Sequence, residues 1–161
     1  MKRLLLTTIA VVLLAGCGSD SSPESPEISL HKAVIKGDIE AVRNYLSAGE
    51  DVNKKGIRLR ETPLHWAAAY NHIEIAELLI SEGAEINVKD KFGITPLEHT
   101  VVKVHFLLAK SLILKGADVN VRDRNGNTPL DRSINNEQTD MITLLREHGA
   151  KTSEELKAER K

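Results

Sequence analysis

The chain has little that could hold it together covalently or fill one large aromatic core. Of its 161 residues only one, Cys17, is a cysteine, so no disulfide can form within the chain. It contains one tryptophan, two tyrosines and two phenylalanines, so aliphatic side chains must supply most of the buried apolar surface. This composition favours many small, regular contacts over a single aromatic-rich core.

The chain also lacks a strong charge of one sign and a long apolar run. Its formal net charge is −1, and removal of residues 1–16, which carry Lys2 and Arg3 but no acidic residue, would leave about −3. A nucleic-acid-binding protein is expected to be basic, so this function is excluded. The N-terminal apolar run from Leu4 to Leu14 is shorter than the roughly 20 residues that a membrane-spanning helix needs.

The N-terminus has the pattern of a secretory signal, with basic residues before the apolar run and small residues after it. Leu14-Ala15-Gly16-Cys17 resembles the lipobox of bacterial lipoproteins. The resemblance implies removal of residues 1–16 as a signal peptide and transfer of lipid to the Cys17 thiol, which is the nucleophilic acceptor. A plain signal peptide followed by a chance cysteine is the alternative.

Residues 17–27 would then form the lipidated cysteine and a disordered tether, because they are rich in Ser, Pro and Glu and have almost nothing to bury. The lipoprotein resemblance implies anchoring in the cell envelope. In such lipoproteins an aspartate after the cysteine favours the inner membrane. Gly18 stands at this position here, so the resemblance favours the inner leaflet of the outer membrane, facing the periplasm.

The rest of the chain repeats with a constant period. A Thr-Pro-Leu tripeptide marks this period at 62–64, 95–97 and 128–130, and a glycine follows each tripeptide at a fixed interval, at Gly83, Gly116 and Gly149. Such a period is typical of stacked supersecondary units. In each unit threonine caps a first helix and glycine ends a second one. Glu98 is expected to complete a capping box with Thr95.

Thr62-Pro63-Leu64-His65-Trp66-Ala67-Ala68 and Gly83-Ala84-Glu85-Ile86-Asn87 resemble the signature of the ankyrin repeat. The resemblance implies an all-α repeat solenoid, with about four helix–turn–helix units and their β-turn fingers stacked in an arc. The expected ankyrin domain covers residues 28–152, with repeats at 28–57, 58–90, 91–123 and 124–152, and a short helix or tail at 153–161. Val104 stands between the two helices of its repeat, where the family prefers glycine, which predicts a distorted turn.

No catalytic constellation is recognisable, because the chain has neither a Gly-rich phosphate loop nor a nucleophile elbow. The sequence therefore predicts a protein without catalytic activity, cofactor or metal site. His65 and His72 could suggest a metal pair, but the ankyrin resemblance implies that they bond backbone groups between units, and His105 repeats His72 one period on. His99 is expected on the surface rather than as a metal ligand.

Ankyrin repeats generally bind proteins through their first helices and finger tips. Mapped by position, the predicted partner-binding residues are an aromatic group with a mainly basic rim: Trp66, Tyr70, Phe92, Lys91, Arg58, Arg60, His99, Lys103 and Arg124. Trp, Tyr and Arg are common interface anchors, and basic fingers suit a partner with an acidic surface. The alternatives are that Trp66 packs against its neighbouring unit and that the finger charges are simply solvated.

These features predict a monomeric, non-catalytic protein-interaction module that is tethered to the membrane by its N-terminal lipid. An immunity protein that captures a periplasm-acting toxin is one specific form of this hypothesis. A scaffold or accessory factor for an envelope enzyme is a second. A binder of anionic lipid or envelope polymer, acting through the basic fingers, is a third.

Overall fold

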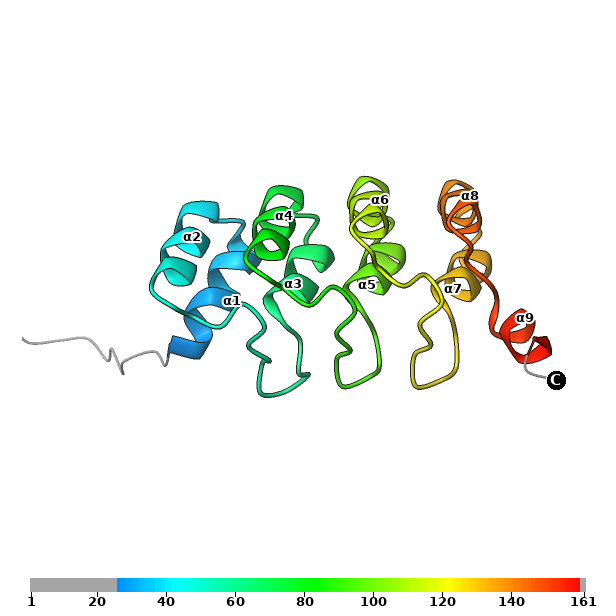
Figure 1. The fold of residues 1–161 in the computed structure, drawn as a ribbon, viewed down its shortest axis with the longest axis horizontal. Helices are drawn as coiled ribbons and strands as arrows, with labels where there is room; N and C mark the ends of the chain where they lie inside the picture. Colours follow the sequence, from blue (N-terminus) through cyan, green and yellow to red (C-terminus); the bar gives the residue numbers. More distant parts are fainter. Residues whose placement is uncertain (1–25, 160–161) are drawn as a thin grey trace, which may run out of the picture.

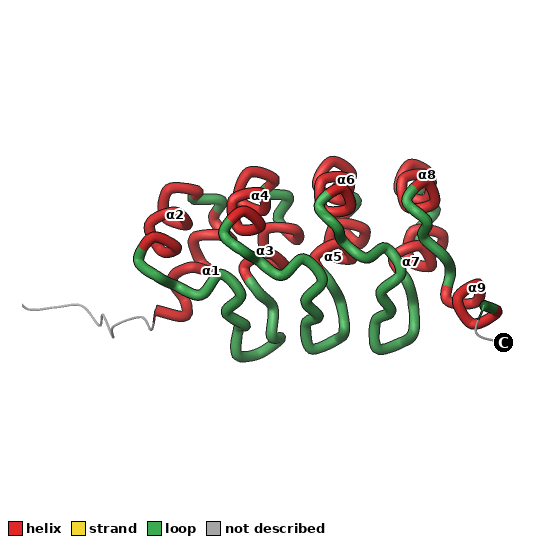
Figure 2. Tube along the Cα trace, viewed as in Figure 1, coloured by secondary structure: helices red, strands yellow, loops and turns green. Residues whose placement is uncertain are grey.

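The computed structural model describes residues 26–159, which form nine α-helices and no strand (Figures 1 and 2). The first eight are paired: α1 (Pro26–Lys36) with α2 (Ile39–Ser47), α3 (Pro63–Ala69) with α4 (Ile73–Ser81), α5 (Pro96–Lys103) with α6 (Phe106–Leu114), and α7 (Pro129–Asn135) with α8 (Thr139–Glu147). A single short helix, α9 (Ser153–Ala158), follows. The predicted all-α repeat solenoid is confirmed, with one helix pair in each predicted repeat.

The four helix pairs stack side by side in two rows (Figure 1). The inner row contains α1, α3, α5 and α7, and the outer row contains α2, α4, α6 and α8. Long loops project past the inner row after each of the first three outer helices (Figure 2). We call these loops finger 1 (residues 51–61), finger 2 (84–94) and finger 3 (117–127). The inner face is the surface formed by the inner helices and the fingers.

The hydrophobic core follows the same period as the sequence. Leucines at equivalent positions of successive repeats are fully buried in both rows: Leu64, Leu97 and Leu130 in the inner helices, and Leu79, Leu112 and Leu145 in the outer helices. They belong to one core cluster that runs through the whole stack. Each repeat therefore depends on its neighbours to cover its apolar faces, as expected of a solenoid.

The turn between the two helices of each repeat contains one residue in the left-handed region. This residue is Gly37 in the first repeat (φ 73°) and Asn71 in the second (φ 59°), followed by Val104 (φ 60°) and Glu137 (φ 55°). The prediction of a distorted turn at Val104 is wrong, because Val104 adopts the same left-handed conformation as the equivalent residues of the other repeats. The departure from glycine appears instead as local strain, since a β-branched residue rarely adopts this conformation.

Polar side chains bond each repeat to the next. In the turns between helices, His72 Nε2 lies 3.3 Å from the Ile35 carbonyl oxygen and His105 Nε2 lies 3.2 Å from that of Ala69. The structural role predicted for these histidines is confirmed. Near the fingers, asparagine side chains bond backbone groups of the following repeat.

The N-terminal boundary differs slightly from the prediction. Helix α1 begins at Pro26, within the tether predicted for residues 17–27 and just before the predicted domain start at residue 28. Proline fits the first turn of a helix, where its missing N–H has no partner to lose. The predicted signal peptide (residues 1–16) and Cys17 lie outside the described residues. Among residues 26–159 no helix is long and apolar enough to cross a membrane.

Candidate partner-binding face

The inner face brings the predicted aromatic residues into neighbouring repeats. Trp66 and Tyr70 lie one turn apart on α3 and stack, with ring centroids 6.1 Å apart. Tyr70 is 49% exposed, and so is Phe92 in finger 2. Trp66 is only partly exposed and also packs against the core. Both interpretations of Trp66 therefore hold in part, because its side chain belongs to the stack and reaches the surface.

An apolar groove of about 610 Å³ lies between α1, finger 1 and α3. Ile35, Ile57, Leu59 and Trp66 supply its apolar lining, and Arg58 stands beside them. Ile57 is 84% exposed, more than any other large apolar side chain in residues 30–159. The sequence places Ile57 and Leu59 on finger 1, but our predicted partner-binding residues were centred on the aromatic side chains and did not include these two. The sequence did carry a sign of this groove. The spacing from Gly49 to Gly83 is one residue longer than the spacing between the later repeat glycines, which places one extra residue in finger 1.

Backbone hydrogen bonds join the fingers to one another. The Lys91 N–H donates to the Leu59 carbonyl at 2.8 Å, and the Arg124 N–H donates to the Phe92 carbonyl at 3.0 Å. Finger 2 is also fixed internally, because Asp90 Oδ1 accepts from the Phe92 N–H at 2.7 Å. The exposed side chains of the fingers therefore stand on a connected backbone rather than on independent loops.

The basic residues of the fingers fall into two groups. Three are engaged within the chain: Lys54 pairs with Glu50 at 3.6 Å, Lys89 donates to the Arg122 carbonyl, and Arg122 donates to the Ser153 carbonyl of α9. The others, together with Lys103 of α5, are exposed and form no ion pair with any residue in 26–159: Lys55, Arg58, Arg60, Lys91, Lys103 and Arg124. All of the predicted basic rim belongs to this second group.

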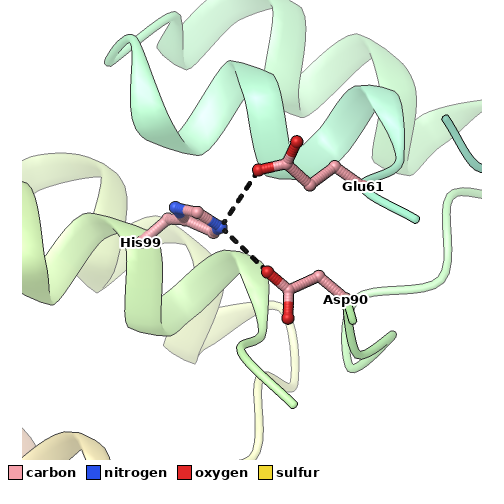
Figure 3. Close-up of side chains that lie close together, drawn as sticks. All are labelled: Glu61, Asp90 and His99. Carbon is pink, nitrogen blue, oxygen red and sulfur yellow. Dashed lines mark ion pairs between the residues drawn. The ribbon is translucent and has the colours of Figure 1, made fainter. Parts of the chain in front are cut away.

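The predicted exposure of His99 is wrong. Its side chain is only 18% exposed and lies between two buried carboxylates, with Nε2 at 4.0 Å from Glu61 Oε1 and 3.9 Å from Asp90 Oδ2 (Figure 3). Burial lowers the pKa of His99, and the charge of Asp90 opposes this effect. Burial raises the pKa of Glu61, and the charge of Asp90 raises it further.

His65 has the structural role that the sequence predicted. Its side chain is fully buried, and its Nδ1 accepts a hydrogen bond from the Thr62 N–H at 3.0 Å. Its Nε2 lies 3.1 Å from the Ile94 carbonyl oxygen in finger 2. Burial lowers the pKa of His65 to about 4, so the ring is neutral at physiological pH and bonds through both nitrogens.

The predicted capping box of Thr95 and Glu98 is only half formed. Thr95 Oγ1 accepts from the Glu98 N–H at 3.4 Å, but the Glu98 carboxylate does not return to the Thr95 amide. Instead it accepts a hydrogen bond from Nε of Arg132, one repeat later, and Arg132 also bonds Asp123. A charged partner in the next repeat outcompetes the local amide, because charge-assisted hydrogen bonds are the stronger ones.

Comparison with known protein families matches the chain over most of its length. The family described as "Ankyrin repeats (3 copies)" matches residues 7–90, 30–123 and 83–155. Curated relatives include the palmitoyltransferase AKR1 of Lachancea kluyveri, 42% identical over 40% of this chain, and the palmitoyltransferase ZDHHC13 of Homo sapiens, 37% identical over 45%. The 2-5A-dependent ribonuclease of Mus musculus is 38% identical over 49%.

The matched segments are small parts of these relatives. They cover 9%, 12% and 11% of the three proteins, respectively, so the chain spans about a tenth of their length. The activities in their names belong to those whole proteins. The similarity shows only that this chain contains a repeat domain like theirs.

Proposed function

The chain belongs to the ankyrin-repeat family, and from this premise we propose that it is a non-catalytic module that binds a partner protein on its inner face. Ankyrin repeats form a non-catalytic interaction fold and generally bind proteins. The partner would dock across repeats 1 to 3, over the groove of finger 1 and the exposed rings of Tyr70 and Phe92.

The observation that carries this proposal is the exposure of apolar side chains on the inner face. Ile57, Leu59, Tyr70 and Phe92 are between 36% and 84% exposed, and Val102 on α5 is 44% exposed. Contiguous exposed apolar surface with a polar rim is the usual anatomy of a protein-binding site. The joined fingers support it, because a pre-formed backbone lowers the entropy lost on binding.

The chemistry of the rim favours a partner with an acidic surface. Exposed basic side chains that form no ion pair within residues 26–159 lie on the same fingers and on α5: Lys55, Arg58, Arg60, Lys91, Lys103 and Arg124. Lys55 and Arg58 line the apolar groove directly. Complementary charge mainly steers the encounter and raises the association rate. The apolar centre would supply most of the affinity.

We also propose that the module is tethered to the bacterial envelope by lipid on Cys17 and faces the periplasm. The support is the sequence Leu14-Ala15-Gly16-Cys17 behind a basic and apolar N-terminus. Cys17→Ser should leave a larger, unprocessed precursor without incorporated fatty acid, which mass spectrometry and labelling with radioactive palmitate would detect. A variant that is still cleaved and still partitions with lipid would contradict the lipid anchor.

The position of the anchor makes an envelope partner the natural one. Capture of a periplasm-acting toxin by an immunity protein is one such role, and assistance to an envelope enzyme as a scaffold is another. Both use the same face, and they differ in whether the partner loses or keeps its activity when bound. A photo-crosslinking amino acid at position 92 would identify the partner in its own envelope, and an activity assay of that partner would decide between the roles.

Binding of anionic lipid or envelope polymer is a second candidate function, favoured by the unpaired basic rim. It differs in its response to salt. Attraction to anionic headgroups is screened at high ionic strength, whereas an interface with an apolar centre persists in part. Sedimentation with vesicles rich in phosphatidylglycerol, at low salt and at 0.5 M salt (about a 4 Å screening length), would separate the two functions.

A further inference from the structure

We propose that Glu61, Asp90 and His99 form a binding site for a divalent transition-metal ion, of which Zn²⁺ fits the donor set best. The three residues come from separate segments: Glu61 precedes α3, Asp90 begins a turn within finger 2, and His99 lies on α5. They converge where repeats 2 and 3 meet (Figure 3). One donor atom from each lies within 4.8 Å of the others.

No hydrogen bond joins the three groups, although His99 Nε2 lies within ion-pair distance of both carboxylates (Figure 3). The distances of 3.9 and 4.0 Å from His99 Nε2 to the two carboxylates exceed the 2.7–3.2 Å range of a hydrogen bond. His99 Nε2 is buried and has no hydrogen-bond partner among the described residues. The Glu61 side chain is only 10% exposed, and its carboxylate forms no hydrogen bond within residues 26–159. Buried polar groups are seldom left unbonded, so His99 Nε2 and the Glu61 carboxylate, with Asp90 Oδ2 beside them, are arranged for a ligand that binds all three residues.

The donor set selects the kind of ion. One imidazole nitrogen and two carboxylate oxygens suit Zn²⁺ and its first-row neighbours, whereas Ca²⁺ and Mg²⁺ prefer oxygen alone. Tetrahedral Zn²⁺ with bonds of about 2.1 Å places adjacent donors about 3.4 Å apart. The two distances from His99 Nε2 to the carboxylate oxygens are longer than this by about 0.5 Å, and all three donor atoms lie within 4.8 Å of one another, so side-chain rotations must bring them closer when an ion binds. Three protein ligands leave the fourth position for a water molecule.

Neighbouring groups orient two of the ligands. Asp90 Oδ1 accepts hydrogen bonds from the Phe92 N–H at 2.7 Å and the Ile94 N–H at 2.9 Å, while Oδ2 faces His99. The His99 ring packs edge-on against the His65 ring, with centroids 5.6 Å apart. Such outer contacts are typical of metal sites, because they hold the donor atoms in place before the ion arrives.

The next repeat shows what the cluster lacks. Asp123 and Arg132 occupy the positions equivalent to Asp90 and His99 one period on, and there the guanidinium of Arg132 bonds both Asp123 and the buried Glu98. That cluster has a permanent cation between its two carboxylates. At the junction of repeats 2 and 3 a histidine takes this position, and an imidazole, unlike a guanidinium, carries no permanent positive charge. A divalent ion would supply the missing charge.

The test is calorimetric titration of the metal-free full chain with ZnCl₂, in a Cys17→Ser background so that no thiol contributes. We expect one Zn²⁺ per chain in this parent. Binding should weaken at least about tenfold in His99→Gln and in Asp90→Asn, whose amide oxygen can still accept the finger's N–H groups. Co²⁺ should give visible d–d absorption in the parent that His99→Gln removes, and Ca²⁺ and Mg²⁺ should not compete.

Two further variants keep the test decisive. His148→Gln removes a histidine outside the cluster and should bind Zn²⁺ as the parent does. His99→Arg copies Arg132 into the equivalent position, so it should fold normally by circular dichroism and lose Zn²⁺ binding. No Zn²⁺ binding in the parent, or equal binding in the parent and in folded His99→Arg, would show that the cluster is an ion pair only and overturn the proposal. The titration involves no partner protein, so its result is separate from that of the proposed function.

Discussion

The side-chain amide of Asn87 donates a hydrogen bond across a repeat boundary to the carbonyl oxygen of Gly116, over 3.2 Å. Oδ1 of the same side chain accepts a hydrogen bond from the Asp118 N–H at 2.8 Å. Asn53 and Asn120 make the same pair of bonds at the other two boundaries. Together with the leucine core, this asparagine ladder couples each repeat to the next.

Asn87→Ala should therefore destabilise the whole domain, because it removes two inter-repeat hydrogen bonds. We expect a loss of about 1–2 kcal/mol in the free energy of unfolding, measured by urea titration. Asn44 is the control, since it is exposed on α2 and its side chain forms no hydrogen bond with a described residue. Equal effects of Asn44→Ala and Asn87→Ala would show that the ladder does not couple the repeats.

Val104→Gly should stabilise the protein. Val104 has φ 60° and ψ 35°, a conformation that costs an ordinary residue about 1–2 kcal/mol and a glycine almost nothing. Glycine loses more backbone entropy on folding, so we expect a net gain of about 0.5–1 kcal/mol. Val102→Gly, at an exposed position within α5, should instead cost about 1 kcal/mol. Thermal unfolding of both variants measures the difference. A Val104→Gly variant that is less stable than the wild type would show that Val104 is not strained in this turn.

His65 should make stability depend on pH. Its pKa falls from 6.5 to about 4 on folding, so between these values the unfolded chain binds a proton that the folded chain does not. Stability should therefore decrease as the pH falls from about 6.5 to about 4, by up to about 3 kcal/mol, and this group should contribute no pH dependence above that window. Urea titrations across the window should show a smaller decrease for His65→Gln. The same decrease in both proteins would contradict the lowered pKa.

The fold could be predicted because its signals are local and recur. Thr-Pro-Leu begins each of α3, α5 and α7, and glycine follows α4, α6 and α8 at the same interval each time. The cluster around His99 could not be predicted in the same way. Its members come from separate segments of two repeats, and their contact depends on how far each side chain reaches across a repeat boundary. The period identifies equivalent positions, but it does not say that a histidine will meet two carboxylates.

The candidate binding face was predicted in outline for the same reason. Repeat positions identify residues on the inner helices and fingers, and Tyr70 and Phe92 are indeed exposed. A repeat position alone does not show how far a side chain also enters the core, as that of Trp66 does. The groove at finger 1 depends on one extra residue that interrupts the period, and its shape follows from the particular conformation of that loop rather than from the repeat.

The most direct test of the account is the affinity of the crosslinked partner for the double variant Tyr70→Ala/Phe92→Ala. These rings are exposed, so their loss should leave the circular dichroism unchanged while weakening binding by about 1–3 kcal/mol per ring, at least about thirtyfold in all. The matched control is Leu107→Ala/Leu114→Ala on α6, which removes two side chains that are 67% and 69% exposed from the outer row. The account predicts loss of binding in the first variant and wild-type binding in the second. Unchanged affinity in the first variant, or an equal loss in both, would contradict binding on the inner face.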